Sequence, residues 1–125
     1  MEKLPEMEEE TPLTKVKVCA GACGFSSVIK VQSCGPNTVK VEILSACTML
    51  RSMNKDMGVM DWTKGIFNKI NESMIYQSAG KHLKHTDCPI PCAITKAIQV
   101  EIGAAVSKDV KIRIVKLDSE LELVD

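Results

Sequence analysis

The chain has 125 residues, its 16 Lys and Arg are balanced by 16 Asp and Glu, and it is 45% apolar but only 3% aromatic. This length fits one domain with an aliphatic core that needs no disulfides. No run of about 18 apolar residues predicts a membrane span. The acidic start lacks an apolar segment of the kind found in signal peptides, so we expect a cytoplasmic protein.

The balanced charge is unevenly distributed along the chain. Residues 1–10 and residues 118–125 each carry a net charge of −4, and the chain between them is basic. A basic body can attract an anionic partner. Because the lysines alternate with Val and Ile and aromatic residues are scarce, we do not expect nucleic-acid binding. The sequence predicts acidic tails at residues 1–13 and 118–125 around a single domain at residues 14–117, with the first tail disordered.

Three stretches in the first half of the domain alternate apolar and polar residues, which is typical of half-buried strands. They are TKVKVCA at residues 14–20, SSVIKVQ at residues 26–32 and TVKVEIL at residues 38–44. The stretch SCGPN between the last two has the residues of a tight turn. We therefore expect an antiparallel meander with one buried face and one lysine-rich face.

Three helices and a last strand are predicted after the meander. The first helix starts at Ser45 and runs to about Met57, Asp61 caps a second helix that Gly80 ends, and the third starts at the prolines of CPIPC. The stretch DVKIRIV at residues 109–115 then alternates as a strand does. The order βββαααβ predicts an α+β domain, in which helices pack on one face of an antiparallel β-meander plus a C-terminal strand.

Methionines recur at helical spacing through the first of these helices and just beyond it. Such a stripe could bind a soft metal, but it more often fills a core, and we expect core packing. The methionines concerned are Met49, Met53, Met57 and Met60.

The chain has six cysteines, and in a reducing cytoplasm thiols bind metals or react more often than they form disulfides. If the strands and helices run up and down in turn, five cysteines meet at the end of the sheet where the first strand finishes. Cys34 then lies in a turn at the other end. No pair has the C-x2-C spacing of common zinc and ferredoxin sites. The expected ligands are Cys23, Cys47, Cys88 and Cys92.

Local features around these cysteines favour ligation by thiolates. Cys47 and Cys92 lie in first helical turns, where the helix dipole favours a thiolate, and the prolines of HTDCPIPC stiffen the backbone at Cys88. Four thiolates suit an iron–sulfur cluster such as [4Fe–4S], which we expect, or alternatively Zn²⁺. Cys19 ranks next as a ligand, and His85 could replace one thiolate.

Several of these motifs resemble a family of small uncharacterised proteins from anaerobic bacteria and methanogenic archaea. The motifs are CGF after the first strand, SAC after the third, and DCPIP followed by KAI and VEIG before the final strand, over about residues 14–116. The resemblance implies the cytoplasm of an anaerobe and marks Cys23, Cys47 and Cys88 as positions of the family pattern. It implies no activity.

Three functions from different classes fit the sequence. The favoured one is a non-enzymatic metal-binding protein with an electron-transfer or accessory role for a redox or enzyme partner. The second is a thiol enzyme or sulfur carrier with Cys92 or Cys88 as the nucleophile, although only His82 and His85 could serve as its base and no Ser-His-Asp arrangement is apparent. The third is an interaction domain with structural cysteines or zinc.

Overall fold

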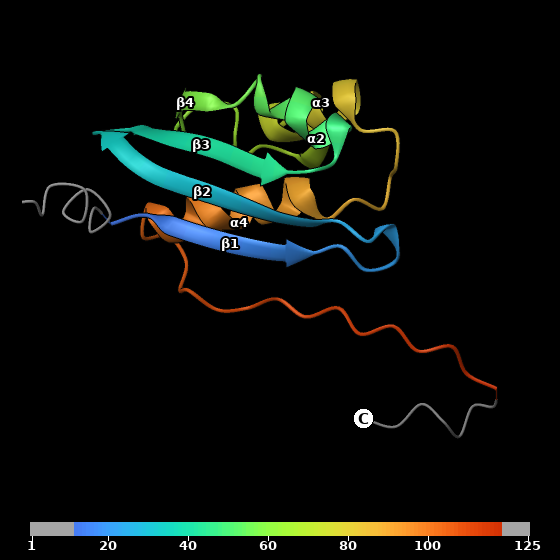
Figure 1. The fold of residues 1–125 in the computed structure, drawn as a ribbon. Helices are drawn as coiled ribbons and strands as arrows, with labels where there is room; N and C mark the ends of the chain where they lie inside the picture. The colour runs from blue at the N-terminus through green and yellow to red at the C-terminus, as the bar shows by residue number, and fades with distance from the viewer. Residues whose placement is uncertain (1–11, 119–125) are drawn as a thin grey trace, which may run out of the picture.

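A computed structural model of the chain describes residues 12–118 and contains one four-stranded antiparallel sheet with helices packed against it (Figure 1). The strands lie side by side in the order β1-β2-β3-β4. Their bounds are Thr14–Cys19 for β1, Ser26–Gly35 for β2, Thr38–Ser45 for β3 and Gly58–Asp61 for β4. The helices are α2 at Thr48–Asn54, α3 at Met74–His82 and α4 at Ile90–Glu101, with 3₁₀ turns η1 at Gly21–Cys23 and η2 at Ile70–Glu72.

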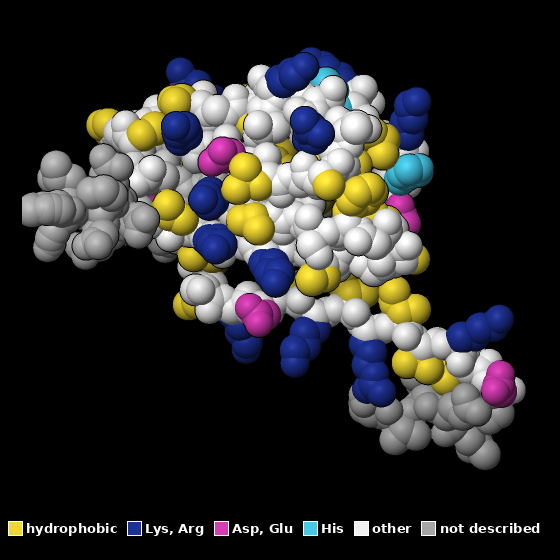
Figure 2. All heavy atoms as spheres, in the orientation of Figure 1, with side chains coloured by type: hydrophobic (Ala, Val, Ile, Leu, Met, Phe, Trp, Pro, Cys, Tyr) yellow, Lys and Arg dark blue, Asp and Glu magenta, His cyan; other side chains and the backbone are white. Residues whose placement is uncertain are grey.

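The meander forms where the sequence alternates, and the α+β class is confirmed. Val16 pairs with Ile29, and Ile29 pairs with Ile43, so apolar side chains of three strands share one face of the sheet. On the other face Lys15 and Lys17 are exposed. Lys and Arg side chains are spread over the strands in Figure 2. Because successive side chains of a strand point to opposite faces of the sheet, the alternation places the apolar residues on one face and the lysines on the other.

The core lies between the apolar face of the sheet and the helices. α4 packs on β1 and β2, while α2 packs on β3. Met53 and Met60 are buried, and Met49 and Met57 pack against the core, so the expectation that the methionines fill the core is confirmed. No helix among residues 12–118 combines the length and the apolar character that a membrane crossing requires.

The first helix is shorter than the sequence predicts. α2 ends at Asn54, whose Oδ1 accepts a hydrogen bond of 2.7 Å from the backbone N–H of Ile43. Gly58, with φ of +104°, then turns the chain into β4, in which Gly58 pairs with Val41. The residues of β4 pair with β3 and do not continue the helix. The helical spacing of Met60 from the earlier methionines is therefore coincidental.

The second predicted helix forms only in its last part. Oδ1 of Asp61 accepts a hydrogen bond of 2.8 Å from the backbone N–H of Thr63, as the side chain of a helix-capping residue would. Here, however, this hydrogen bond closes a turn and no helix starts at this point. Gly65, with φ of +73°, continues the irregular path, and α3 starts only after Ser73. Gly80 lies inside α3 and does not end it.

The predicted C-terminal strand is absent from the described structure, and the order βββαααβ is corrected accordingly. The fourth strand is β4, which lies between α2 and α3 in the sequence, and residues 104–118 belong to no helix or strand. The segment at 109–115 has strand-like alternation but no neighbouring strand among residues 12–118. Of the tails predicted at 1–13 and 118–125, residues 1–11 and 119–125 lie outside the described residues.

Candidate functional site

Three connections bring cysteines to the end of the sheet where β1 finishes (Figure 1). Cys23 lies in η1 between β1 and β2, Cys47 follows β3 as the N-cap of α2, and Cys88 precedes α4. The register pairs Ser27 with Ser45, so the connections at Cys23 and Cys47 start from the same level of the sheet. This is the convergence that alternating element directions predict.

Cys23 is exposed at the tip of a tight connection. The connection is closed by a hydrogen bond of 3.1 Å from the N–H of Ala20 to the carbonyl of Phe25. Inside it, the N–H of Gly24 donates to the carbonyl of Gly21 at 2.9 Å, with Gly24 at φ of +84°. Because a left-handed residue favours glycine, the sequence CGF suits this turn.

Cys47 is buried above the end of the sheet. Its backbone N–H donates to Oγ of Ser45 at 3.1 Å, and Ser45 in turn accepts a hydrogen bond of 2.8 Å from Oγ of Ser27. Two strands and the start of α2 therefore fix the position of this thiol.

Cys88 is half-buried, and its thiol interacts with both of the others. Burial raises the pKa of Cys88, and the charges of Cys47, Cys23 and Asp87 raise it further, while a hydrogen bond from the backbone N–H of Ile90 opposes the shift. Like charges in proximity disfavour the thiolate form. Cys47 and Cys23 therefore lie close enough to Cys88 to affect its ionisation.

Cys92 has a different neighbour. It is exposed on α4 and hydrogen-bonded to Tyr76 of α3, whose pKa is raised by burial and by the charge and hydrogen bond of Cys92. The buried side chains of α4 are Ile90, Pro91, Ile94, Ala97 and Ile98. At 100° per residue Cys92 lies opposite this apolar side, which the periodicity of the helix could have predicted.

The remaining predicted candidates lie at the margin of this group or away from it. Cys19, exposed at the end of β1, accepts a hydrogen bond of 3.8 Å from Oγ of Ser26. His85 is exposed, and its carbonyl accepts the N–H of Cys88 at 3.3 Å. Cys34 lies near the β2–β3 turn, and its thiol donates to Thr38 at 3.6 Å. That turn is at the opposite end of the sheet, as predicted.

The side chains do not stand in the geometry of a single-ion site. Among residues 12–118, no group of three or more His, Cys, Asp or Glu side chains is close enough to hold one metal ion. Zn–S bonds of about 2.3 Å in a tetrahedron put thiolate sulfurs roughly 4 Å apart. Coordination of one ion would therefore require the thiols to move together.

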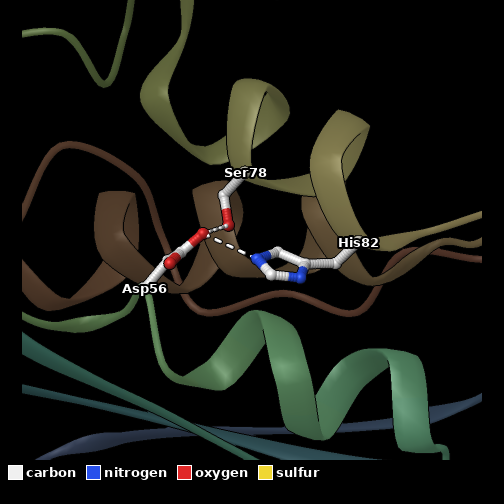
Figure 3. A network of polar contacts seen from close by, with 3 residues as sticks. All are labelled: Asp56, Ser78 and His82. Carbon is white, nitrogen blue, oxygen red and sulfur yellow. Dashed lines mark hydrogen bonds and ion pairs between the residues drawn. The ribbon is translucent and has the colours of Figure 1, made fainter.

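A polar network that the sequence did not predict joins the chain after α2 to α3 (Figure 3). Oδ2 of Asp56 accepts a hydrogen bond of 2.8 Å from Oγ of Ser78 and lies 2.8 Å from Nε2 of His82. These hydrogen bonds, first that of Ser78 and then that of His82, lower the pKa of Asp56. The one available signal was the spacing of Ser78 and His82, four residues apart on one helix.

This network has the residue types of a catalytic triad but not its arrangement. In a triad the imidazole lies between the carboxylate and the hydroxyl and takes the hydroxyl proton. Here the carboxylate of Asp56 lies in the middle and engages both Ser78 and His82 (Figure 3). The contacts stabilise the packing of α3 and do not activate Ser78 as a nucleophile.

A protein-family model matches residues 14–114, and its description is a family of unknown function, DUF6951. The chain belongs to DUF6951. The resemblance to an uncharacterised family is thus confirmed, although the match does not extend to the source organisms. All six cysteines lie inside the matched range, which for DUF6951 also includes the extended segment up to Ile114. No curated protein and no solved structure matches the chain.

Proposed function

We propose that the protein carries an iron–sulfur cluster on the thiolates of Cys23, Cys47 and Cys88, and that it serves an electron-transfer or accessory role for a partner protein. The observation that supports this best is the placement of Cys23, Cys47 and Cys88 in three connections at one end of the sheet. The pKa of Cys88, raised first by burial and then also by the charges of Cys47 and Cys23, agrees with this placement.

Thiolates in proximity repel one another, and a bound cationic centre removes that repulsion. Metal binding then displaces the thiol protons, so the free energy of binding compensates for the unfavourable ionisation of Cys88. A purely structural role would account for Cys47, since buried cysteine acts as a small apolar residue. It does not account for Cys23, which is exposed and contributes to no core.

We favour an iron–sulfur cluster over a single zinc ion at these thiols. No three such donors among residues 12–118 are within reach of one ion, whereas a cluster of several iron and sulfide atoms has thiolate ligands that are further apart. The N–H of Ile90 that hydrogen-bonds to Cys88 is also the kind of donor that tunes the reduction potential of a cluster.

Cys92 is the proposed fourth ligand, and ligation would replace its hydrogen bond with Tyr76. Cys19 and His85 are the alternatives that flank Cys23 and Cys88 in sequence. We do not favour Cys88 as the nucleophile of a thiol enzyme, because a raised pKa reduces the thiolate fraction at neutral pH.

The test compares iron and acid-labile sulfide bound after anaerobic reconstitution of Cys23→Ser and Cys34→Ser. Both cysteines are exposed, so neither change should disturb the core. We expect Cys23→Ser to lose most of its iron and sulfide and Cys34→Ser to retain the wild-type content. Equal loss in both variants, or a colourless wild-type protein with stoichiometric zinc, would contradict the proposal.

The fourth ligand is identified in the same assay with Cys92→Ser, Cys19→Ser and His85→Ala. All three residues are exposed. The variant that loses cluster identifies the ligand, and we expect it to be Cys92→Ser.

A further inference from the structure

The segment after α4 has the pattern of a strand but pairs with none in the described structure. It projects from the body of the molecule, with apolar side chains uncovered in Figure 2. Val110, Ile112 and Ile114 are 58%, 78% and 88% exposed. β-branched residues that alternate with polar ones are typical of a half-buried strand. The segment therefore has an apolar side that is suited to a sheet.

β1 offers a strand edge for such pairing. Within the sheet of residues 12–118, β1 pairs with β2 on one side and forms the edge on the other. Its inward-facing Val16 and Val18 are only half-buried, whereas Ile29 and Val31 on β2 are fully buried. One further strand beside β1 would extend the cover over these valines. Unpaired strand edges are templates for the addition of another strand.

The direction of the segment decides which β1 it fits. α4 ends beside the start of β1, where Oγ1 of Thr14 donates to Oε1 of Glu101 at 2.7 Å. After Gly103, with φ of +80°, the chain runs in the same direction as β1 (Figure 1). On its own β1 it would thus form a parallel pair in an otherwise antiparallel sheet. A two-fold axis normal to the sheet would reverse the direction of β1 in a second copy. The segment would then be antiparallel to the β1 of that copy.

We propose that residues 110–115 form a strand on the β1 edge of a second copy of the chain, with reciprocal exchange between the two copies. Such an arrangement is closed by its two-fold symmetry and continues the antiparallel pattern of the sheet. Residues 104–109 can span up to about 20 Å, which is enough to reach a neighbouring molecule. The DUF6951 match runs to residue 114, so it includes all but the last residue of this segment.

The charges at this interface predict how salt affects it. Lys15 and Lys17 are exposed on the outer face of β1, and Lys111 alternates with the apolar side of the segment. If the apolar sides face α4, these lysines share the outer face, where like charges on neighbouring strands repel. Salt screens this repulsion, so the dimer should become tighter as ionic strength rises.

The test uses the full chain and two measurements, the mass in solution by light scattering and amide hydrogen exchange of residues 110–115. We expect twice the 13.7 kDa chain mass, together with slow exchange in the segment. Ile112→Pro removes a ladder donor and should give a folded monomer with fast exchange in the segment. Val106→Pro, in the linker before the strand, is the matched control and should remain dimeric.

Three outcomes would overturn the proposal. A wild-type monomer with a protected segment would mean that the strand closes on its own β1, and a monomer with an unprotected segment would mean that it pairs with no copy. A dimer that Ile112→Pro leaves intact would mean that another surface joins the chains. None of these outcomes depends on metal content, so they are distinct from the test of the cluster.

Discussion

Glu101, in the last turn of α4, accepts hydrogen bonds from two strands, and its replacement by alanine should destabilise the fold. Oε1 of Glu101 accepts from Oγ1 of Thr14 at 2.7 Å, and Oε2 accepts from the backbone N–H of Ser33 at 2.8 Å. A hydrogen bond to a charged group contributes about 1.5–3 kcal/mol when it is well buried. Glu101 is only half-buried and Ser33 is exposed, so we expect a combined loss of about 1–3 kcal/mol.

The assay is urea unfolding followed by circular dichroism, with a thermal scan in parallel. The expected loss corresponds to a decrease in Tm on the order of 5–15 °C for a domain of this size. Glu101→Gln keeps one acceptor oxygen and should lose less than Glu101→Ala. Glu72→Ala is the control, because Glu72 is exposed on η2. If Glu101→Ala unfolds at the same urea concentration as Glu72→Ala, the two hydrogen bonds do not hold α4 to the sheet.

Two further predictions concern titratable groups. The folded-state pKa of Asp56 is lowered, so its contribution to stability is present above the ordinary carboxyl pKa of about 4 and is lost as pH falls through the folded-state pKa. The Asp56→Asn variant should accordingly be less stable than the wild type at neutral pH, and its stability should depend less on pH below about 4. An acid-unfolding profile identical to that of the wild type would show that Asp56 does not stabilise the fold in this way. The pKa of Cys88 is raised, so its alkylation rate should reach half of its maximum at a higher pH in the metal-free folded protein than in the urea-denatured chain. Mass spectrometry measures the alkylation of this residue. An equal or lower midpoint pH in the folded protein would contradict the burial of this thiol.

The meander could be predicted from the sequence because its signal is local. Each of the first three strands alternates Val or Ile with polar residues, and the turn at Gly35 has an unambiguous composition. β4 could not be predicted, since its four residues form a strand only by pairing with β3, which lies about 20 residues earlier. Long-range pairing overrode the helical spacing of the methionines there.

The candidate site could be predicted in part for a related reason. Alternating element directions were enough to bring the connections at Cys23, Cys47 and Cys88 to one end of the sheet and to leave Cys34 at the other. The neighbour of Cys92 depends on the rotation of α4 about its axis, and the hydrogen bonds of Asp56 depend on where α2 ends. Neither follows from the order of elements along the chain.

The most direct measurement of the central claim is the Mössbauer spectrum of the wild-type protein after anaerobic reconstitution with isotopically enriched iron and sulfide. The proposal predicts a spectrum of iron in tetrahedral sulfur coordination within a cluster, with sulfide bound in proportion to iron, because thiolates of Cys23, Cys47 and Cys88 would supply the protein ligands. A spectrum of isolated or non-specifically bound iron, without bound sulfide, would contradict it.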